Sequence, residues 1–364
     1  MVKNFIFLPQ TSIQITMKKI PLLVAIMLSM NVLSQEIENL VKAAGDANKI
    51  ANAYSAPALE GLIYSMNNGW FHTAEVHKKF GFDITIGFSG AFVPSERESY
   101  NIQSLGLEST IISAPNQAPT IFGEGDGGNL TLQTTVSGFD NTTGSPINDA
   151  TVDIDIDLPK GFKEDLPGNV VPAPGIQLSV GLPWKLETTL RYVPKVGSED
   201  VKGSLFGIGL KKELTDLLGP LDRLPLHLAV MATYTNMDVD GTIDDSSDPN
   251  FIVRNAATEF RLNAYSIQAL ASLNFPFINI YGAVGYGSGN ATSRVLGDYT
   301  VVYDAPNGRR IRAEFKDPIK QEFSAGSMKA TLGLRVSLGF FKIFTDYTVQ
   351  EYNTISGGIA FSFR

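Results

Sequence analysis

Three histidines, His72, His77 and His227, are the side chains of this chain best suited to proton transfer near neutral pH. Barrel phospholipases and acyltransferases pair such a histidine with a serine at the rim, so a lipid hydrolase is one class to weigh. The local motif of those phospholipases is missing, as are the serine nucleophile elbow, the metalloprotease helix and the phosphate-binding glycine loop. We therefore predict structural roles for the histidines and no enzyme activity. We expect His72 and His77 to flank the rim, where the first strand begins.

Two acidic stretches have the composition of cation-binding sites. In TVDIDIDLP, Asp153, Asp155 and Asp157 alternate with apolar residues and share one face of a strand. Residues 236–250 are rich in aspartate but lack the ligand spacing and the terminal glutamate of a calcium loop. We interpret both as solvated surfaces and predict no metal site and no cofactor. The chain has no cysteine, which excludes disulfides, thiolate metal ligands and a cysteine nucleophile.

A larger set of charged residues alternates with apolar ones. In KATLGLRVSLGF, Lys329 and Arg335 fall on one strand face and the leucines on the other. If several such polar faces enclose a common interior, that interior must hold water or pair its charges, because unpaired burial is costly. A closed lumen and a polar passage both satisfy this condition. The predicted lumen-lining residues are Glu187, Arg191, Lys211, His227, Lys329, Arg335, Lys342, Asp346 and Arg364.

The stretches that carry these residues are about ten residues long, which at about 3.3 Å per residue and a tilt near 45° spans about 25 Å, the apolar height of an outer-membrane barrel. Strands of soluble proteins average only about five or six residues. We predict an all-β fold, a transmembrane antiparallel up-and-down β-barrel. Its clear spans lie near 76–92, 175–183, 185–195, 203–212, 225–236, 258–273, 276–287, 325–339, 341–351 and 354–364.

Connection lengths test the barrel independently, because inner turns are short and outer loops long when the C-terminus faces the periplasm. Residues 339–341 and 274–276 are short where inner turns are due, whereas 287–323 and 236–258 are long where outer loops are due. Between the first two clear spans, the chain must cross the membrane an even number of additional times to keep this order of inner turns and outer loops. Strand-like pieces that could do so occur at 104–112, 129–139 and 150–158. We predict about 12 strands, within a range of about 10–14.

The N-terminal residues predict export. Lys18 and Lys19 precede an apolar run over 21–33, and small residues lie before Gln35, so residues 1–34 have the pattern of a secretory signal peptide cleaved near Gln35. Met17 is an alternative start, in which case residues 1–16 are mis-assigned. Removing residues 1–34 takes away three lysines and no acid, which changes the net charge from −8 to −11. This charge disfavours nucleic acid as a partner.

Residues 35–75 differ from the barrel region, 76–364. Apolar residues between 40 and 51 recur at helical spacing, and turn-forming residues follow them. Such a segment could be a hatch inside the lumen or a periplasmic helix under the rim, and the sequence leaves both open. The candidate hatch residues are Pro57, Asn67, Asn68 and Trp70.

The stretch from Asn48 through Pro94, with PWKLETTLRYVPKV and GSLFGIGLKKEL, resembles an uncharacterised outer-membrane β-barrel family of Bacteroidota. The layout of a hatch-like segment, a barrel and a long early insertion is similar to that of the long-chain fatty-acid outer-membrane transporter superfamily. In place of that superfamily's asparagine-proline-alanine hatch motif, this chain has Ser55-Ala56-Pro57-Ala58. The resemblance implies a barrel, and no substrate or binding residue is carried over from it.

These inferences predict an integral protein of the cell outer membrane. Its expected function is passage or binding of a small polar or amphipathic solute, with outer-membrane lipid around the barrel. The alternative is a closed accessory barrel that docks another envelope or secretion-system protein through its long loops.

Overall fold

The computed structural model describes residue 38 and residues 40–165, 167–216, 219 and 224–363. The predicted signal peptide, its cleavage site and Arg364 lie outside these residues. Among the described residues, no helix is both long and apolar enough to cross a bilayer.

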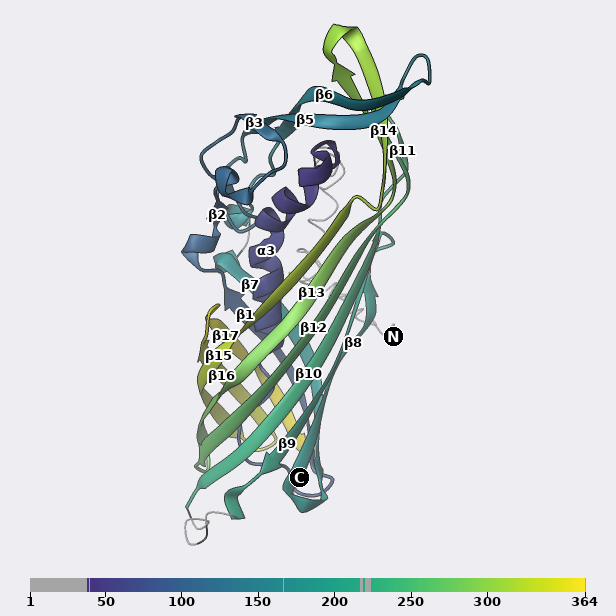
Figure 1. Ribbon diagram of the computed structural model, residues 1–364. Helices are drawn as coiled ribbons and strands as arrows, with labels where there is room; N and C mark the ends of the chain where they lie inside the picture. The colour runs from purple at the N-terminus through teal and green to yellow at the C-terminus, as the bar shows by residue number, and fades with distance from the viewer. Residues whose placement is uncertain (1–37, 39, 166, 217–218, 220–223, 364) are drawn as a thin grey trace, which may run out of the picture.

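Ten antiparallel strands pair side by side into a ring, which β17 closes by pairing with β1 (Figure 1). This confirms the predicted barrel. In order around the ring, the strands are β1 (Phe82–Phe92), β7 (Val170–Leu182), β8 (Leu186–Gly197), β9 (Val201–Glu213), β10 (Leu226–Thr242), β12 (Phe251–Asn274), β13 (Ile278–Ala305), β15 (Ile319–Leu338), β16 (Phe341–Val349) and β17 (Thr354–Phe363).

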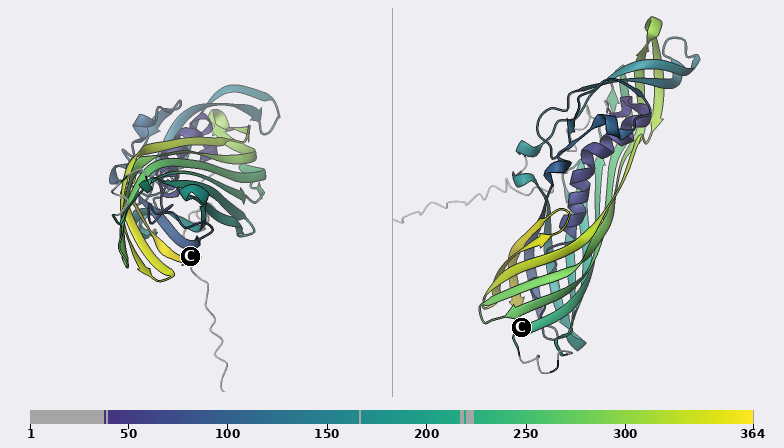
Figure 2. Two further views of the ribbon diagram at one scale, coloured as in Figure 1. Left: turned by 90° about the horizontal axis from the view of Figure 1, so that it is seen from below. Right: turned by 60° about the vertical axis from the view of Figure 1, so that its left-hand side comes forward.

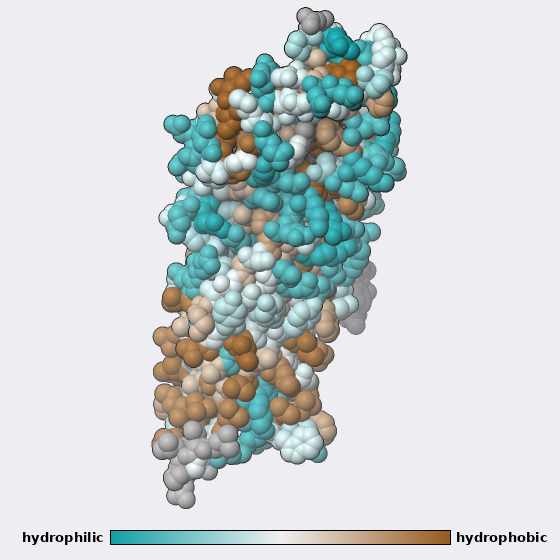
Figure 3. Space-filling view, viewed as in Figure 1, coloured by the Kyte–Doolittle hydropathy of each residue, from teal (hydrophilic) through white to brown (hydrophobic). Residues whose placement is uncertain are grey.

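The strands form because their side chains alternate between two environments. In β15, Leu332 and Leu334 are exposed on the outer face, whereas Thr331 and Arg335 are buried inside the ring. The outward apolar residues make a band around the lower part of the face seen in Figure 3, and the upper part is mostly hydrophilic. Exposed aromatic residues gather near the short turns (Phe80, Trp184, Phe275, Phe277, Phe340) and further along the strands (Tyr192, Tyr234, Tyr265, Tyr286). This is the surface that a lipid-embedded barrel requires.

Short turns lie at the end of the ring where β17 finishes, and we call this the periplasmic end by the general rule for such barrels. The connections 183–185, 275–277 and 339–340 are there. The longest connections, 93–169 and 306–318, lie at the opposite end, which we call the extracellular end.

The ring has ten strands rather than the twelve that we expected, at the lower limit of the predicted range. The extra strand-like pieces do not cross: β5 (Asn129–Asp140) and β6 (Pro146–Asp157) form a hairpin beyond the ring, joined by β3 (Thr110–Ser113) and β14 (Arg309–Lys316). One face of this hairpin packs on an apolar core and the other meets water. A strand between core and water has the same two-residue period as one between lipid and lumen.

Residues 93–169 form a cap at the extracellular end, which shares one apolar core with the N-terminal helix and the upper strands (Figure 1). The core joins Leu130 and Ile156 of the hairpin to Ile50 of the N-terminal helix and Val301 of β13, all buried. The minor elements of the chain are β2 (Ser99–Tyr100), β4 (Ala118–Pro119), β11 (Ser246–Ser247), and 3-10 turns at Ser95–Arg97, Ile102–Leu105, Lys163–Asp165, Pro167–Asn169, Pro183–Lys185 and Pro306–Gly308.

The N-terminal segment enters the ring from beneath this cap. It consists of η2 (Ala44–Asp46) and α3 (Ala47–Met66), and α3 packs on β1, β7, β12, β13 and β15 (Figure 2). Residues 67–81, which we call the latch, continue without regular structure toward the periplasmic end, where β1 begins. The segment therefore passes through the interior of the ring from one end to the other.

One seam of the ring is incomplete. β7 pairs with β1 from Val170 to Val180, but with β8 only between Gln177, opposite Arg191, and the turn. Gly181 donates its backbone N–H to Gly81, on the β1 side. Because the backbone groups of successive residues point to alternate sides, those of the even-numbered residues of β7 point toward β8. Pro172 and Pro174 are such residues and have no N–H to donate. Continuing the register would set Pro174 opposite Pro194, so the sequence itself ends this ladder.

Candidate functional site

The C-terminus of α3 meets two cations of the barrel wall. The last turn of a helix leaves carbonyl oxygens without intrahelical partners and carries partial negative charge. The last turn of α3 has no basic residue of its own. Instead, Arg191 donates through Nη1 to the Met66 oxygen at 3.1 Å, and Lys329 donates through Nζ to the Asn67 oxygen at 2.7 Å. The wall thus caps the helix.

Arg191 and Lys329 approach this turn from opposite sides. Their strands, β8 and β15, are five positions apart in the ring of ten, and each side chain is 3% exposed. Arg191 also donates to the oxygens of Asn68 and Gly69, at 3.0 and 3.1 Å, and stacks 4.0 Å from the ring centre of Trp70. Within the part of the chain that the structure describes, neither cation lies within 4 Å of a carboxylate oxygen. Backbone oxygens take that place.

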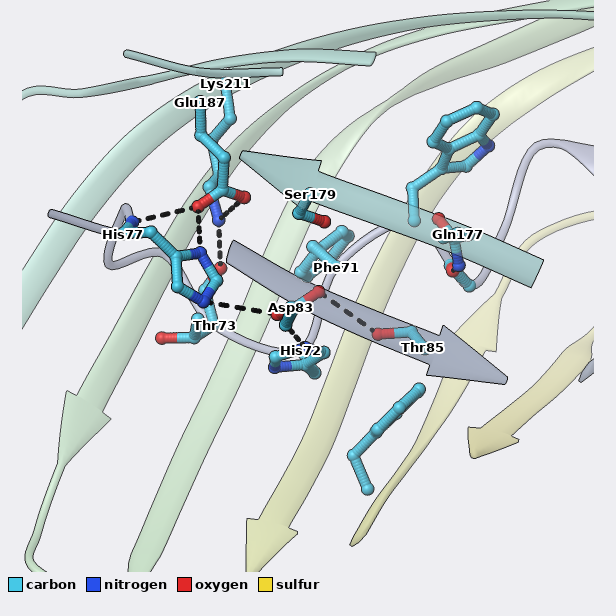
Figure 4. A pocket seen from close by; sticks show the side chains of 13 residues that line it. Phe71, His72, Thr73, His77, Asp83, Thr85, Gln177, Ser179, Glu187 and Lys211 are labelled. Atoms are coloured by element: carbon cyan, nitrogen blue, oxygen red, sulfur yellow. Dashed lines mark hydrogen bonds and ion pairs between the residues drawn. The ribbon is translucent and has the colours of Figure 1, made fainter. Parts of the chain in front are cut away.

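Toward the periplasmic end, two latch histidines share a wall carboxylate (Figure 4). The Nε2 atoms of His72 and His77 lie 3.2 and 3.3 Å from Oδ2 of Asp83, which belongs to β1. His77 also places its backbone N–H and its Nδ1 at 3.0 and 2.8 Å from Glu187. Glu187 in turn pairs with Lys211 at 2.8 Å. The latch and the wall therefore form one continuous ionic network.

The bonding partners of each imidazole restrict its protonation. Nη1 of Arg335 lies 3.1 Å from Nδ1 of His72. Because a guanidinium only donates, Nδ1 of His72 accepts, and its Nε2 carries the hydrogen toward Asp83. His72 is therefore neutral. In His77 both ring nitrogens face carboxylates, those of Asp83 and Glu187.

Other wall groups bind the latch through its backbone. Lys211 donates to the oxygens of Thr73 and Glu75, at 3.3 and 3.1 Å, and Gln177 donates to the oxygen of Gly69 at 2.7 Å. The space left among these side chains offers only about 10 Å³ to the centres of water molecules, enough for about one. The lumen is occluded at this height.

The structure brings most of the predicted lumen residues to this network and places Lys342, Asp346 and His227 around it, whereas Arg364 lies outside the described residues. Lys342 is half-buried on β16, Asp346 accepts from the Tyr281 hydroxyl at 2.9 Å, and His227 contacts Glu213 at 2.8 Å near the periplasmic end. Of the hatch candidates, Pro57 is buried within α3, and Asn67, Asn68 and Trp70 form the turn below it. No group of His, Asp or Glu among the described residues is arranged to hold a metal ion.

Sequence reasoning missed Asp83 and Gln177. Both lie on the polar face of strands that it did predict, so the alternation in FDITIGF and GIQLSV could have found them. It assigned His72 and His77 to the rim, whereas both are in the lumen network. The backbone oxygens that Arg191 and Lys329 bind have no signature in the sequence at all.

A family model described as "Family of unknown function (DUF6588)" matches residues 17–363. No curated protein matches the chain. Among solved structures, it is similar to Ail, the attachment invasion locus protein of Yersinia pestis, at 8% identity, covering 79% of this chain and 100% of that one, with a TM-score of 0.23. It is also similar to the outer membrane protease OmpT from Escherichia coli, at 11% identity, covering 80% of this chain and 100% of that one, with a TM-score of 0.25. Similarities this low carry no argument about function.

Proposed function

This chain belongs to the DUF6588 family, whose function is unknown, and from its geometry we propose an outer-membrane barrel for gated passage or binding of a small polar or amphipathic solute. The latch is the gate. Residues 40–66 anchor it at the extracellular end, and its release opens the lower lumen.

The observation that carries this proposal is the large share of polar contacts between latch and wall, beside one small apolar cluster around Trp70 and Ala74. Arg191, Lys211, Lys329 and Arg335 hold the latch through hydrogen bonds to oxygen and nitrogen atoms. A buried ionic contact contributes little net stability, because the desolvation of its charges offsets their attraction. Water or a polar solute can replace each of these bonds at small cost. An apolar plug would have no such substitute.

The incomplete β7–β8 seam supports a lateral route to the latch. The cap core and α3 fill the extracellular end, so an axial path is blocked. The seam begins between Ile176 and Tyr192, both exposed on the outer face and at the level of the outer aromatic residues. Arg191, at the foot of the seam, reaches the latch directly. An amphipathic solute at the membrane surface would meet this opening first.

Because the chain has no native cysteine, this route can be closed reversibly. Pro174→Cys/Pro194→Cys, joined across the seam by oxidation or a short dithiol-reactive linker, should abolish solute uptake into proteoliposomes. Reducing a disulfide should restore it. Each single variant, treated in the same way, is the matched control. Uptake that persists after complete cross-linking would refute the lateral route.

A closed accessory barrel is the second candidate, and the cap favours it. Residues 93–169 present a large folded surface outside the ring, and the lumen beneath is filled. Co-purification from detergent extracts distinguishes the two functions. A stoichiometric envelope partner, together with no solute flux in the wild type or in latch-release variants, would establish docking in place of passage.

A further inference from the structure

We infer that the lower lumen selects small oxyanions, such as carboxylate or phosphate groups, and that Arg191 and Lys329 form the selecting pair. This inference rests on the proposed function and names the solute class for that route. The two cations define the narrow point at which the latch meets α3.

The latch itself indicates what these cations bind. Four consecutive backbone oxygens, those of residues 66–69, accept hydrogen bonds from Arg191 and Lys329 at 2.7–3.1 Å. The oxygens form a compact group, in which those of Met66 and Asn67 carry the partial negative charge of the helix end and those of Asn68 and Gly69 follow directly. A solute that displaces the turn must supply oxygen acceptors in the same place. A guanidinium prefers the paired oxygens of a carboxylate or phosphate, which match its fork of donors.

Displacement of the latch would leave these cations without compensation. Two carboxylates of the same lumen keep cationic or imidazole partners on the wall, Glu187 with Lys211 and Glu213 with His227. Asp346 accepts from the neutral Tyr281 hydroxyl, and Asp83 would lose His72 and His77 together with the latch. Water can replace the lost hydrogen bonds but brings no negative charge, so two cations that face each other favour an anion at this point. Facing Arg and Lys side chains are also how anion-conducting pores select charge.

The polar atoms around Arg191 leave further capacity for a ligand. Its Nε and the Oε1 of Gln177 have no hydrogen-bond partner among the described residues, although both side chains are at least 95% buried. Both line a small cavity beside Gly69 and Gly175, next to the foot of the seam. The arginine therefore still has a donor directed toward the proposed route.

The test uses the full chain with one introduced cysteine. Thr73 lies on the latch with its hydroxyl 3.3 Å from that of Ser272, so Thr73→Cys should react slowly with a membrane-impermeant maleimide while the latch is seated. We expect potassium phosphate or succinate to accelerate labelling at least severalfold relative to potassium chloride of equal ionic strength. Replacing potassium by choline should have no effect. Ser65→Cys, a nearly isosteric change at a fully buried position of α3, should stay unreactive in every salt.

Second-site variants assign the effect to the two cations. In the Thr73→Cys background, Arg191→Gln and Lys329→Gln should each remove the acceleration by oxyanions, and Lys329→Arg should restore it. Lys195→Gln is the matched control, because Lys195 is also on β8 but forms an exposed pair with Asp240. Labelling that is insensitive to oxyanions, or that keeps its sensitivity in Arg191→Gln, would overturn the inference.

Flux measurements separate this inference from the proposed function. Proteoliposomes that pass neutral or cationic solutes but show no oxyanion preference would retain the gated barrel and exclude the selecting pair. Oxyanion-dependent labelling without any flux would retain the binding site and exclude passage.

Discussion

The upper and lower halves of the N-terminal segment are held by different forces. Near the cap, Ile50 and Ala47 are fully buried among Leu130, Ile156 and other apolar residues. Below Met66, hydrogen bonds and ion pairs to the barrel wall predominate, beside a small apolar cluster of Trp70 and Ala74 with four wall residues. Apolar packing is lost when water enters, whereas each polar contact can be replaced by water. One segment can therefore be fixed at one end and exchangeable at the other.

The largest expected effect comes from removing the segment. Deleting residues 36–75 should change the barrel from closed to conducting, because it removes α3 and most of the latch from the interior of the ring. Single-channel recording in planar bilayers measures this change. Deleting 141–145, the exposed tip of the cap hairpin, is the control and should leave the barrel closed. Unchanged permeability after the first deletion would count against the hatch.

An intermediate effect is expected from paired substitutions in the two halves. Ile50→Ala should lower the free energy of unfolding by about 2–5 kcal/mol, because it opens a cavity in an apolar core. Lys329→Met should change it by about 1 kcal/mol or less, because the lost bond is offset by the desolvation that no longer occurs. Urea unfolding in detergent measures both. Equal losses would show that the two halves are held alike.

The smallest effect concerns a polar contact within the apolar half. Asp46 is buried and accepts the backbone N–H groups of Glu108 and Ser109 at 2.7 and 2.9 Å. Burial by itself disfavours its carboxylate, but these hydrogen bonds and Lys49 outweigh burial and lower the pKa below 3.8. The folded state therefore gains stability from Asp46 above the unfolded-state pKa, and loses it as the pH falls through the lowered value.

Unfolding curves between pH 7 and pH 2 test this contact. Wild-type protein should lose stability toward the acid end of this range, and Asp46→Asn should lack that component of the loss. Asp153→Asn, on the exposed face of β6, is the control and should follow the wild type. An identical acid response in Asp46→Asn would exclude the contact.

Period-two alternation located all ten strands of the ring, because part of each strand separates lipid from lumen. It placed the upper parts of β12 and β13 in outer loops, where they pack on the cap core instead. It failed for β5 and β6, since core and water impose the same period as lipid and lumen. The charged residues of the wall could be predicted for the same reason, because they fall on the polar face of the alternating strands. Their partners were not, because Arg191 and Lys329 bind backbone oxygens, which every residue carries.

Local sequence alone determined the strands, their polar faces and the break at Pro172 and Pro174, because side-chain alternation and a missing N–H act within one strand. Tertiary structure decided that the hairpin lies outside the membrane, that α3 lies inside the ring, and that cations from opposite walls meet at its end. These outcomes depend on closure of the ring, which brings β8 and β15 to one point although more than a hundred residues separate them in the chain.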